Sequence, residues 1–96
     1  MEVEERSAAI GALSLTAREI EYISLAAIGF KNIEIADILS VTNSTVKKTL
    51  ETVFSKLQAR NRTNAVTVAF VHEIITPQKL AEISLKYKDS IDKIAK

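Results

Sequence analysis

The residues of this chain that could bind a ligand lie on one side of a helix predicted over residues 43–57. They include two adjacent lysines, Lys47 and Lys48. Four hydrogen-bonding side chains share this side of the helix: Asn43, Ser44, Thr45 and Glu51. Lysine ammonium groups pair with phosphates, and hydroxyl, amide and carboxylate groups hydrogen-bond to the edges of bases. The sequence therefore predicts a helical surface that contacts both the backbone and the bases of a nucleic acid.

The opposite side of the same helix has a different character. Its apolar residues recur at helical spacing: Val46, Leu50, Val53, Phe54 and Leu57. Such a stripe is typical of a helix face that packs into a core. The lysines are informative because they lie opposite this stripe.

The charge of the chain is unevenly distributed. The whole chain has a net charge of only +1, whereas residues 43–62 carry five basic side chains against one acidic side chain. A local basic segment is typical of a nucleic-acid surface. Within it, Lys56 faces solvent or a phosphate. Arg62 could clamp a phosphate or could be structural, paired with an acid such as Glu19.

Composition excludes several other functions. The chain has 96 residues, 47% of them hydrophobic, with two Gly and one Pro, which favours one all-α domain. It has no cysteine, and His72 is its only histidine, so we expect no disulfide and no metal site. We find no nucleophile–base pair or Gly-rich phosphate loop, so we expect no catalytic residue and no cofactor.

The sequence also bears on where the protein is found. No apolar run approaches the length of about 20 residues that a membrane span needs. The first residues are acidic, unlike the basic start of a secretory signal. We therefore expect a cytoplasmic protein that does not contact a membrane.

Two further helices are predicted before the helix that carries Lys47 and Lys48. Thr16 and Glu19 predict a capping box at the start of the first helix, and Gly29 predicts its end. We expect Asn32 to cap a second helix over residues 33–39. The dipeptide Ser40–Val41 then makes a turn, and we expect Thr42 to cap the helix that carries the lysines.

The rest of the chain predicts two further helices. Thr63 is expected to cap a helix over residues 64–75, whose apolar residues cover most of its circumference. Thr76 and Pro77 predict the start of a last helix. Its apolar stripe has the spacing of a short coiled coil and consists of Leu80, Ile83, Tyr87, Ile91 and Ile94.

This last stripe has two interpretations. It could fold back onto its own domain, or it could pair with a second chain. We favour pairing, because a small DNA reader gains affinity by binding two half-sites. The predicted dimerisation residues are Val68, Val71, His72, Ile75, Leu80, Ile83, Tyr87, Ile91 and Ile94.

Several motifs resemble the LuxR/GerE/NarL-type helix-turn-helix domain, in order and at matching spacing. The segments that carry the resemblance are Leu15–Glu21, Gly29, Asn32–Ala36, Leu39, Thr45–Lys47, Lys56–Leu57, Asn61–Thr63 and Ala65–Val66. The resemblance implies a four-helix domain whose third helix lies in the major groove and whose fourth helix commonly pairs two subunits. Three positions depart from the family pattern: Ile33 replaces a common Lys, Thr49 a common His and Gln58 a common Gly.

The resemblance implies a sequence-specific transcriptional regulator. We expect an N-terminal leader (1–13), a DNA-binding domain (14–75) and a C-terminal helix for dimerisation or packing (76–96). The expected partners are double-stranded DNA and a second copy of the chain, with RNA polymerase as a further candidate. Because little precedes the domain, we expect a stand-alone regulator. The alternative is an interaction module, or antagonist, that pairs with a larger homologous regulator.

Overall fold

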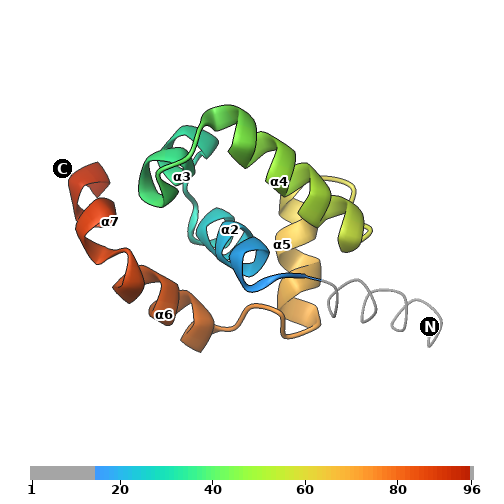
Figure 1. Cartoon of the computed structure of the whole chain (residues 1–96). Coiled ribbons are helices and arrows are strands. Elements are labelled where there is room, and N and C mark those ends of the chain that lie inside the picture. The colour runs from blue at the N-terminus through green and yellow to red at the C-terminus, as the bar shows by residue number, and fades with distance from the viewer. Residues whose placement is uncertain (1–14, 96) are drawn as a thin grey trace.

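The computed structural model describes residues 15–95, and this part of the chain consists of helices joined by short turns (Figure 1). The helices are α2 (Ala17–Ile28), α3 (Asn32–Leu39), α4 (Asn43–Lys56), α5 (Arg62–Val71), α6 (Pro77–Lys86) and α7 (Lys88–Ala95). The all-α prediction is confirmed. The predicted leader, residues 1–13, lies outside the described residues. Among the helices described, none is long and apolar enough to cross a membrane.

Helix α2 lies at the centre of the domain (Figure 1). Helices α3, α4, α5 and α6 all pack against it, and α7 packs against α3. Six consecutive residues of α2, Glu21 to Ala26, are buried. An amphipathic surface helix would alternate buried and exposed positions, so this run shows that α2 is covered on all sides.

The caps predicted for α2 and α4 are confirmed. Thr16 accepts a hydrogen bond from the Glu19 amide at 3.0 Å, and the Glu19 carboxylate accepts one from the Thr16 amide at 2.9 Å. Gly29 ends α2 at a φ of 115°, which glycine adopts without steric cost. Thr42 caps α4 by accepting from the Thr45 amide at 3.1 Å. These local bonds fix where both helices begin.

Two other predicted caps are wrong. Helix α3 begins after Lys31, whose amide donates to the Glu34 carboxylate at 2.8 Å, so Asn32 lies inside the helix. Helix α5 begins after Asn61, which accepts from the Asn64 amide at 2.8 Å. Asn61 is a strong capping residue that stands two positions before Thr63, so Thr63 falls within the first turn.

The predicted helix over residues 64–75 also ends early. Helix α5 ends at Val71, and Glu73 has a left-handed φ of 59°, which a continuing helix does not allow. The turn that follows places Ile75 in the core with no exposed surface.

The single helix predicted over residues 76–96 is wrong as well. The chain bends at Tyr87, which separates α6 from α7. This bend lets α6 follow α2 while α7 follows α3 (Figure 1). Leu80, Ile83, Tyr87, Ile91 and Ile94 all pack against the core of their own chain. The structure therefore shows the fold-back alternative rather than a continuous coiled-coil seam.

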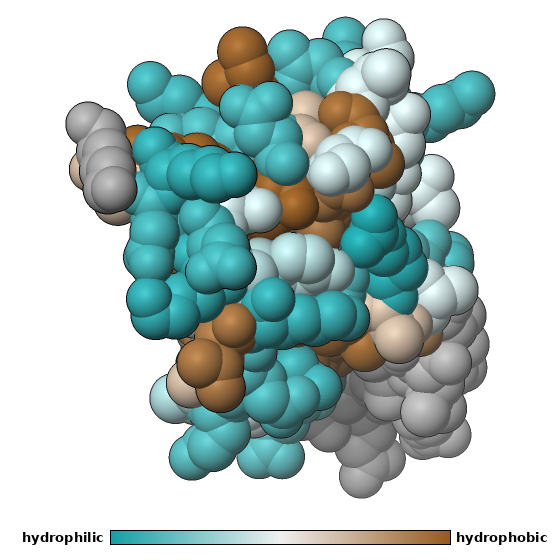
Figure 2. All heavy atoms as spheres, turned by 60° about the vertical axis from the view of Figure 1, so that its left-hand side comes forward, coloured by the Kyte–Doolittle hydropathy of each residue, from teal (hydrophilic) through white to brown (hydrophobic). Residues whose placement is uncertain are grey.

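Figure 2 shows the face of the domain on which α7 lies. Hydrophilic side chains cover most of it, and hydrophobic atoms show in the gaps between them. The inward stripe of α6 and α7 thus leaves a mostly polar exterior.

The second residue after α4 offers a test of backbone strain. Gln58 follows the α4 C-cap and has a φ of 56°, where the family commonly has Gly. A side chain in this conformation costs about 1–2 kcal/mol. Glycine removes that cost, but it makes the unfolded chain more flexible, which lowers stability by about 0.5–1 kcal/mol. We predict that Gln58→Gly raises the free energy of unfolding in urea by about 0.5–1 kcal/mol.

The control uses the same substitution at an ordinary helical position. Gln78 is exposed in the first turn of α6 and does not have a positive φ. Gln78→Gly should lower stability by up to about 1 kcal/mol. Equal effects of the two glycines on stability would contradict the assignment of strain to Gln58.

Candidate nucleic-acid interface

The polar side of α4 forms one continuous solvent-facing surface. The residues on it are Asn43, Ser44, Thr45, Lys47, Lys48 and Glu51, and all of them are exposed. Most of the other side of the helix is buried, since Val46 and Val53 have no exposed area and Leu50 has 2%, while Phe54 is partly buried. The structure therefore brings six of the predicted DNA-binding residues together. We call them the α4 polar face.

The turn between α3 and α4 orients this face. Ser40 ends α3 in the left-handed conformation, and the Val41 amide donates to the Ala36 carbonyl at 2.9 Å. Thr42 then caps α4. Helices α3 and α4 pack on each other as well as on α2. Two packed helices joined by a tight turn, with the second helix exposing polar groups, match the helix-turn-helix arrangement.

A shallow recess lies beside the start of the α4 polar face. It runs between the first turns of α3 and α4, and it is lined by Asn32, Ile33, Asn43, Ser44 and Lys47. Ile33 is 59% exposed there. The N-terminal ends of two helices and one lysine favour an anion, whereas the isoleucine adds only apolar surface.

Lys56 occupies a different place from the α4 polar face. Its ammonium group contacts the two carboxylate oxygens of Glu19 at 2.8 and 3.1 Å, which ties the end of α4 to the start of α2. Burial alone would raise the pKa of Glu19, but hydrogen bonds from Lys56 and Thr16 outweigh burial and lower that pKa. This geometry supports a structural role for Lys56.

Arg62 is also directed into the fold. Its guanidinium donates to the Asn32 side-chain oxygen at 2.6 Å and to the Phe30 carbonyl. Burial lowers its pKa. The structural alternative for Arg62 therefore fits the geometry, although its partners are amide and carbonyl oxygens rather than Glu19. Arg62 holds the loop that precedes α3.

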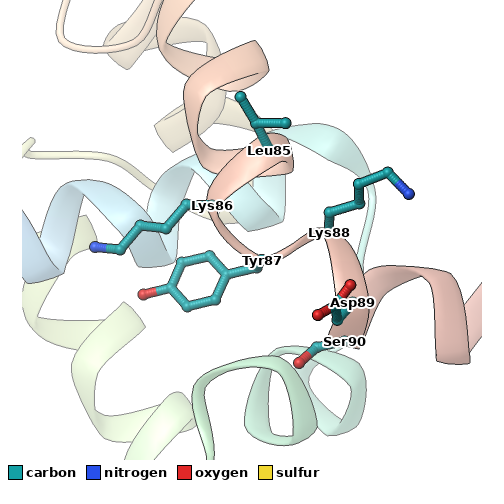
Figure 3. A pocket seen from close by; sticks show the side chains of 6 residues that line it. All are labelled: Leu85, Lys86, Tyr87, Lys88, Asp89 and Ser90. Carbon is teal, nitrogen blue, oxygen red and sulfur yellow. The ribbon is translucent and has the colours of Figure 1, made fainter.

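Sequence reasoning missed a polar cluster between α2 and the α6–α7 junction. Glu21, whose side chain is only 11% exposed, accepts hydrogen bonds from Lys86 at 2.6 Å, from the Tyr87 hydroxyl at 2.7 Å and from Arg18 at 3.1 Å. Figure 3 shows Lys86 and Tyr87 extending in the same direction from the α6–α7 junction, while Lys88 extends the opposite way. We call these four residues the Glu21 cluster: Arg18, Glu21, Lys86 and Tyr87.

The partners of Glu21 stabilise its charged form. Burial alone would raise the pKa of Glu21, but hydrogen bonds from Lys86, Tyr87 and Arg18 outweigh burial and lower that pKa. Burial and the neighbouring carboxylate raise the pKa of Tyr87, so its hydroxyl stays protonated and donates. A signal was present in the sequence, because Glu21 falls among the apolar positions of α2 and a buried carboxylate needs partners.

The predicted dimerisation residues fall into three groups by exposure. Val71 is 69% exposed, whereas Ile75 and Ile83 are buried. The other six are half-buried: Val68, His72, Leu80, Tyr87, Ile91 and Ile94. The outer side of α5 exposes an uncharged stripe, Thr63, Thr67, Phe70 and Val71, at the spacing of one helix face. Of the predicted residues, Val71 has the largest exposed fraction.

Comparison with known proteins finds a family model and curated relatives that match the helix-turn-helix part of the chain. A family model described as bacterial regulatory proteins, luxR family, matches residues 13–69. The chain is 44% identical over 61 residues to the response regulator protein VraR of Staphylococcus aureus, of Staphylococcus saprophyticus and of Staphylococcus epidermidis. The match covers 64% of this chain but 29% of each relative, so the chain spans less than a third of the length of these curated relatives. No solved structure gives a significant match.

Proposed function

The chain belongs to the luxR family of bacterial regulatory proteins, and we propose that it is a sequence-specific transcriptional regulator that binds double-stranded DNA as a homodimer. The family consists of regulators rather than enzymes, in line with the absence of catalytic motifs in the sequence. The observation that carries the proposal is the α4 polar face. It is the exposed side of the second helix of a helix-turn-helix.

In the proposed mode, α4 enters the major groove with its polar face toward the bases. The groove is about 12 Å wide and admits one helix. Lys47 and Lys48 lie where they can neutralise phosphates or donate to guanine, and Asn43 can pair with adenine. Glu51, near the middle of the helix, can accept from a cytosine amino group. RNA polymerase would be a further partner of a regulator bound in this way.

The homodimer is proposed on the outer side of α5. A surface stripe of Thr63, Thr67, Phe70 and Val71 has no charge to desolvate, so two copies can pack on it at low cost. Two copies related by a two-fold axis would present two α4 helices to a palindromic site. The stripe of α6 and α7 is not needed for this interface, because it already packs within the chain.

The DNA-binding role is tested by removing the two lysines. We predict that Lys47→Ala/Lys48→Ala lowers affinity at least tenfold for duplexes that the wild type selects from a random-sequence pool. Each lost phosphate contact should also reduce the salt slope by about one unit. Fluorescence anisotropy at several salt concentrations measures both effects.

The control removes the same number of charges elsewhere. Lys79→Ala/Lys88→Ala affects α6 and α7, and this pair should change affinity much less. Equal losses in both double variants would mean that net charge, not the α4 polar face, drives binding. Wild type that binds no DNA at low salt, yet associates with a larger regulator, would support the alternative of an interaction module.

Ile33 allows a gain-of-function test. A lysine there would place an ammonium group at the recess between the first turns of α3 and α4. We predict that Ile33→Lys raises DNA affinity about threefold to tenfold at low salt and steepens the salt slope by about one unit per subunit. Leu85→Lys is the matched control, since Leu85 is 74% exposed on α6, away from α4 (Figure 1). If both lysines raise affinity equally, the recess has no special place in the interface.

The dimer is tested with a charge on α5. We predict that Val71→Asp shifts the protein from dimer to monomer in sedimentation equilibrium, because two carboxylates would have to be buried in the shared interface. Its fold should persist, as Val71 is 69% exposed. Leu85→Asp, at an equally exposed position of α6, should remain dimeric. A Val71→Asp variant that stays dimeric would place the interface elsewhere.

A further inference from the structure

The end of α3 depends on a residue of another helix. The last four carbonyl groups of a helix have no partner within it, and α3 has no basic residue in its own last turn. Arg18 of α2 donates from Nη2 to the Leu39 carbonyl at 3.2 Å. A cation at a helix C-terminus also interacts favourably with the helix dipole. Arg18 therefore caps α3 from outside.

The turn that follows needs this support. Ser40 has a φ of 58°, a conformation that costs a non-glycine residue about 1–2 kcal/mol. Helix α3 is only eight residues long, too short to be stable without tertiary contacts. A strained turn after a marginal helix keeps one geometry only where neighbouring groups fix it.

Arg18 is oriented by the C-terminal helices. Its other terminal nitrogen, Nη1, donates to Glu21 at 3.1 Å and to the Tyr87 hydroxyl at 3.2 Å. Tyr87 in turn donates to the same Glu21 oxygen at 2.7 Å. The guanidinium also lies 5.7 Å from the centre of the Tyr22 ring. A continuous chain of contacts thus runs from the α6–α7 junction, through α2, to the last carbonyl of α3.

We propose that Tyr87 is a positioning residue for the helix-turn-helix: through Glu21 and Arg18 it fixes the end of α3, and with it the direction in which α4 faces DNA. The inference rests on the proposed function for its effect on DNA, but the fixing of the turn is a property of the free protein. Packing alone does not account for the arrangement. The apolar stripe of α6 and α7 already covers the core, and that task needs the ring of Tyr87 but not its hydroxyl.

The test removes only that hydroxyl. In Tyr87→Phe we expect the backbone amide resonances of Leu39, Ser40 and Val41 to shift in the absence of DNA. We also expect DNA affinity to fall about threefold to tenfold. This is less than the roughly tenfold to hundredfold value of one hydrogen bond to a charged group, because Glu21 still holds Arg18 in the variant. The control is Ser90→Ala, which removes a hydroxyl three residues away and should change neither measurement. All variants are compared at a temperature where circular dichroism shows full folding.

A double-mutant cycle shows whether Tyr87 acts through Arg18. Arg18→Lys keeps the charge but loses the two-pronged contact, so it should lower affinity by itself. We expect the double variant Arg18→Lys/Tyr87→Phe to be no weaker than the weaker single variant, because both break one chain of contacts. Losses that multiply would overturn the proposal, as would a Tyr87→Phe variant that melts earlier but keeps its affinity and its turn resonances.

The outcomes also separate this inference from the proposed function. If the wild type binds no DNA, the proposed function fails, and the amide resonances of the free protein still decide the role of Tyr87. If the wild type binds DNA and Tyr87→Phe leaves the Leu39–Val41 resonances in place, the inference fails while the proposed function stands.

Discussion

Helix α2 is buried on every side from Glu21 to Ala26, and the other helices are placed by the need to cover it. An apolar helix could be covered in many orientations, but α2 also carries two glutamates, the buried Glu21 and the partly buried Glu19. A buried carboxylate is costly unless it is paired and hydrogen-bonded. Glu19 is met by Lys56 of α4, and Glu21 by groups of α6 and the α6–α7 junction. The two glutamates thus help to specify which surfaces of α4 and α6 pack against α2, which apolar contacts alone would not do.

Much of the functional half of the molecule could be predicted from sequence because local rules decide it. The two ends of α2 are set by Thr16, Glu19 and Gly29, through contacts between residues three or four positions apart. The two faces of α4 follow from helical spacing alone, and the structure exposes one and buries the other. Asn61 and Thr63 show that two nearby residues can both be suited to cap one helix. Two capping residues stood near each other, and the better-placed one began the helix.

The remaining features depend on contacts between distant parts of the chain. The stripe from Leu80 to Ile94 has the same spacing whether it meets a second chain or its own core, so periodicity could not distinguish the two. At the bend at Tyr87, the surface beneath the stripe changes from α2, which α6 contacts, to α3, which α7 contacts. The partners of Arg62 and Lys56 likewise come from segments that lie 30 or more positions earlier. No local pattern marks such pairs.

The distance along the chain between Arg18 and Tyr87 has a consequence for synthesis on the ribosome. These residues are 69 positions apart, yet they share one cluster that supports the end of α3. Segments α2 to α5 leave the ribosome first and can collapse early, since nascent domains begin to fold as they emerge. The Glu21 cluster nevertheless stays incomplete until residues 86 and 87 have been made. An interrupted translation product that ends before these residues would carry α3 and α4, but its Arg18 would lack the hydrogen bond to Tyr87.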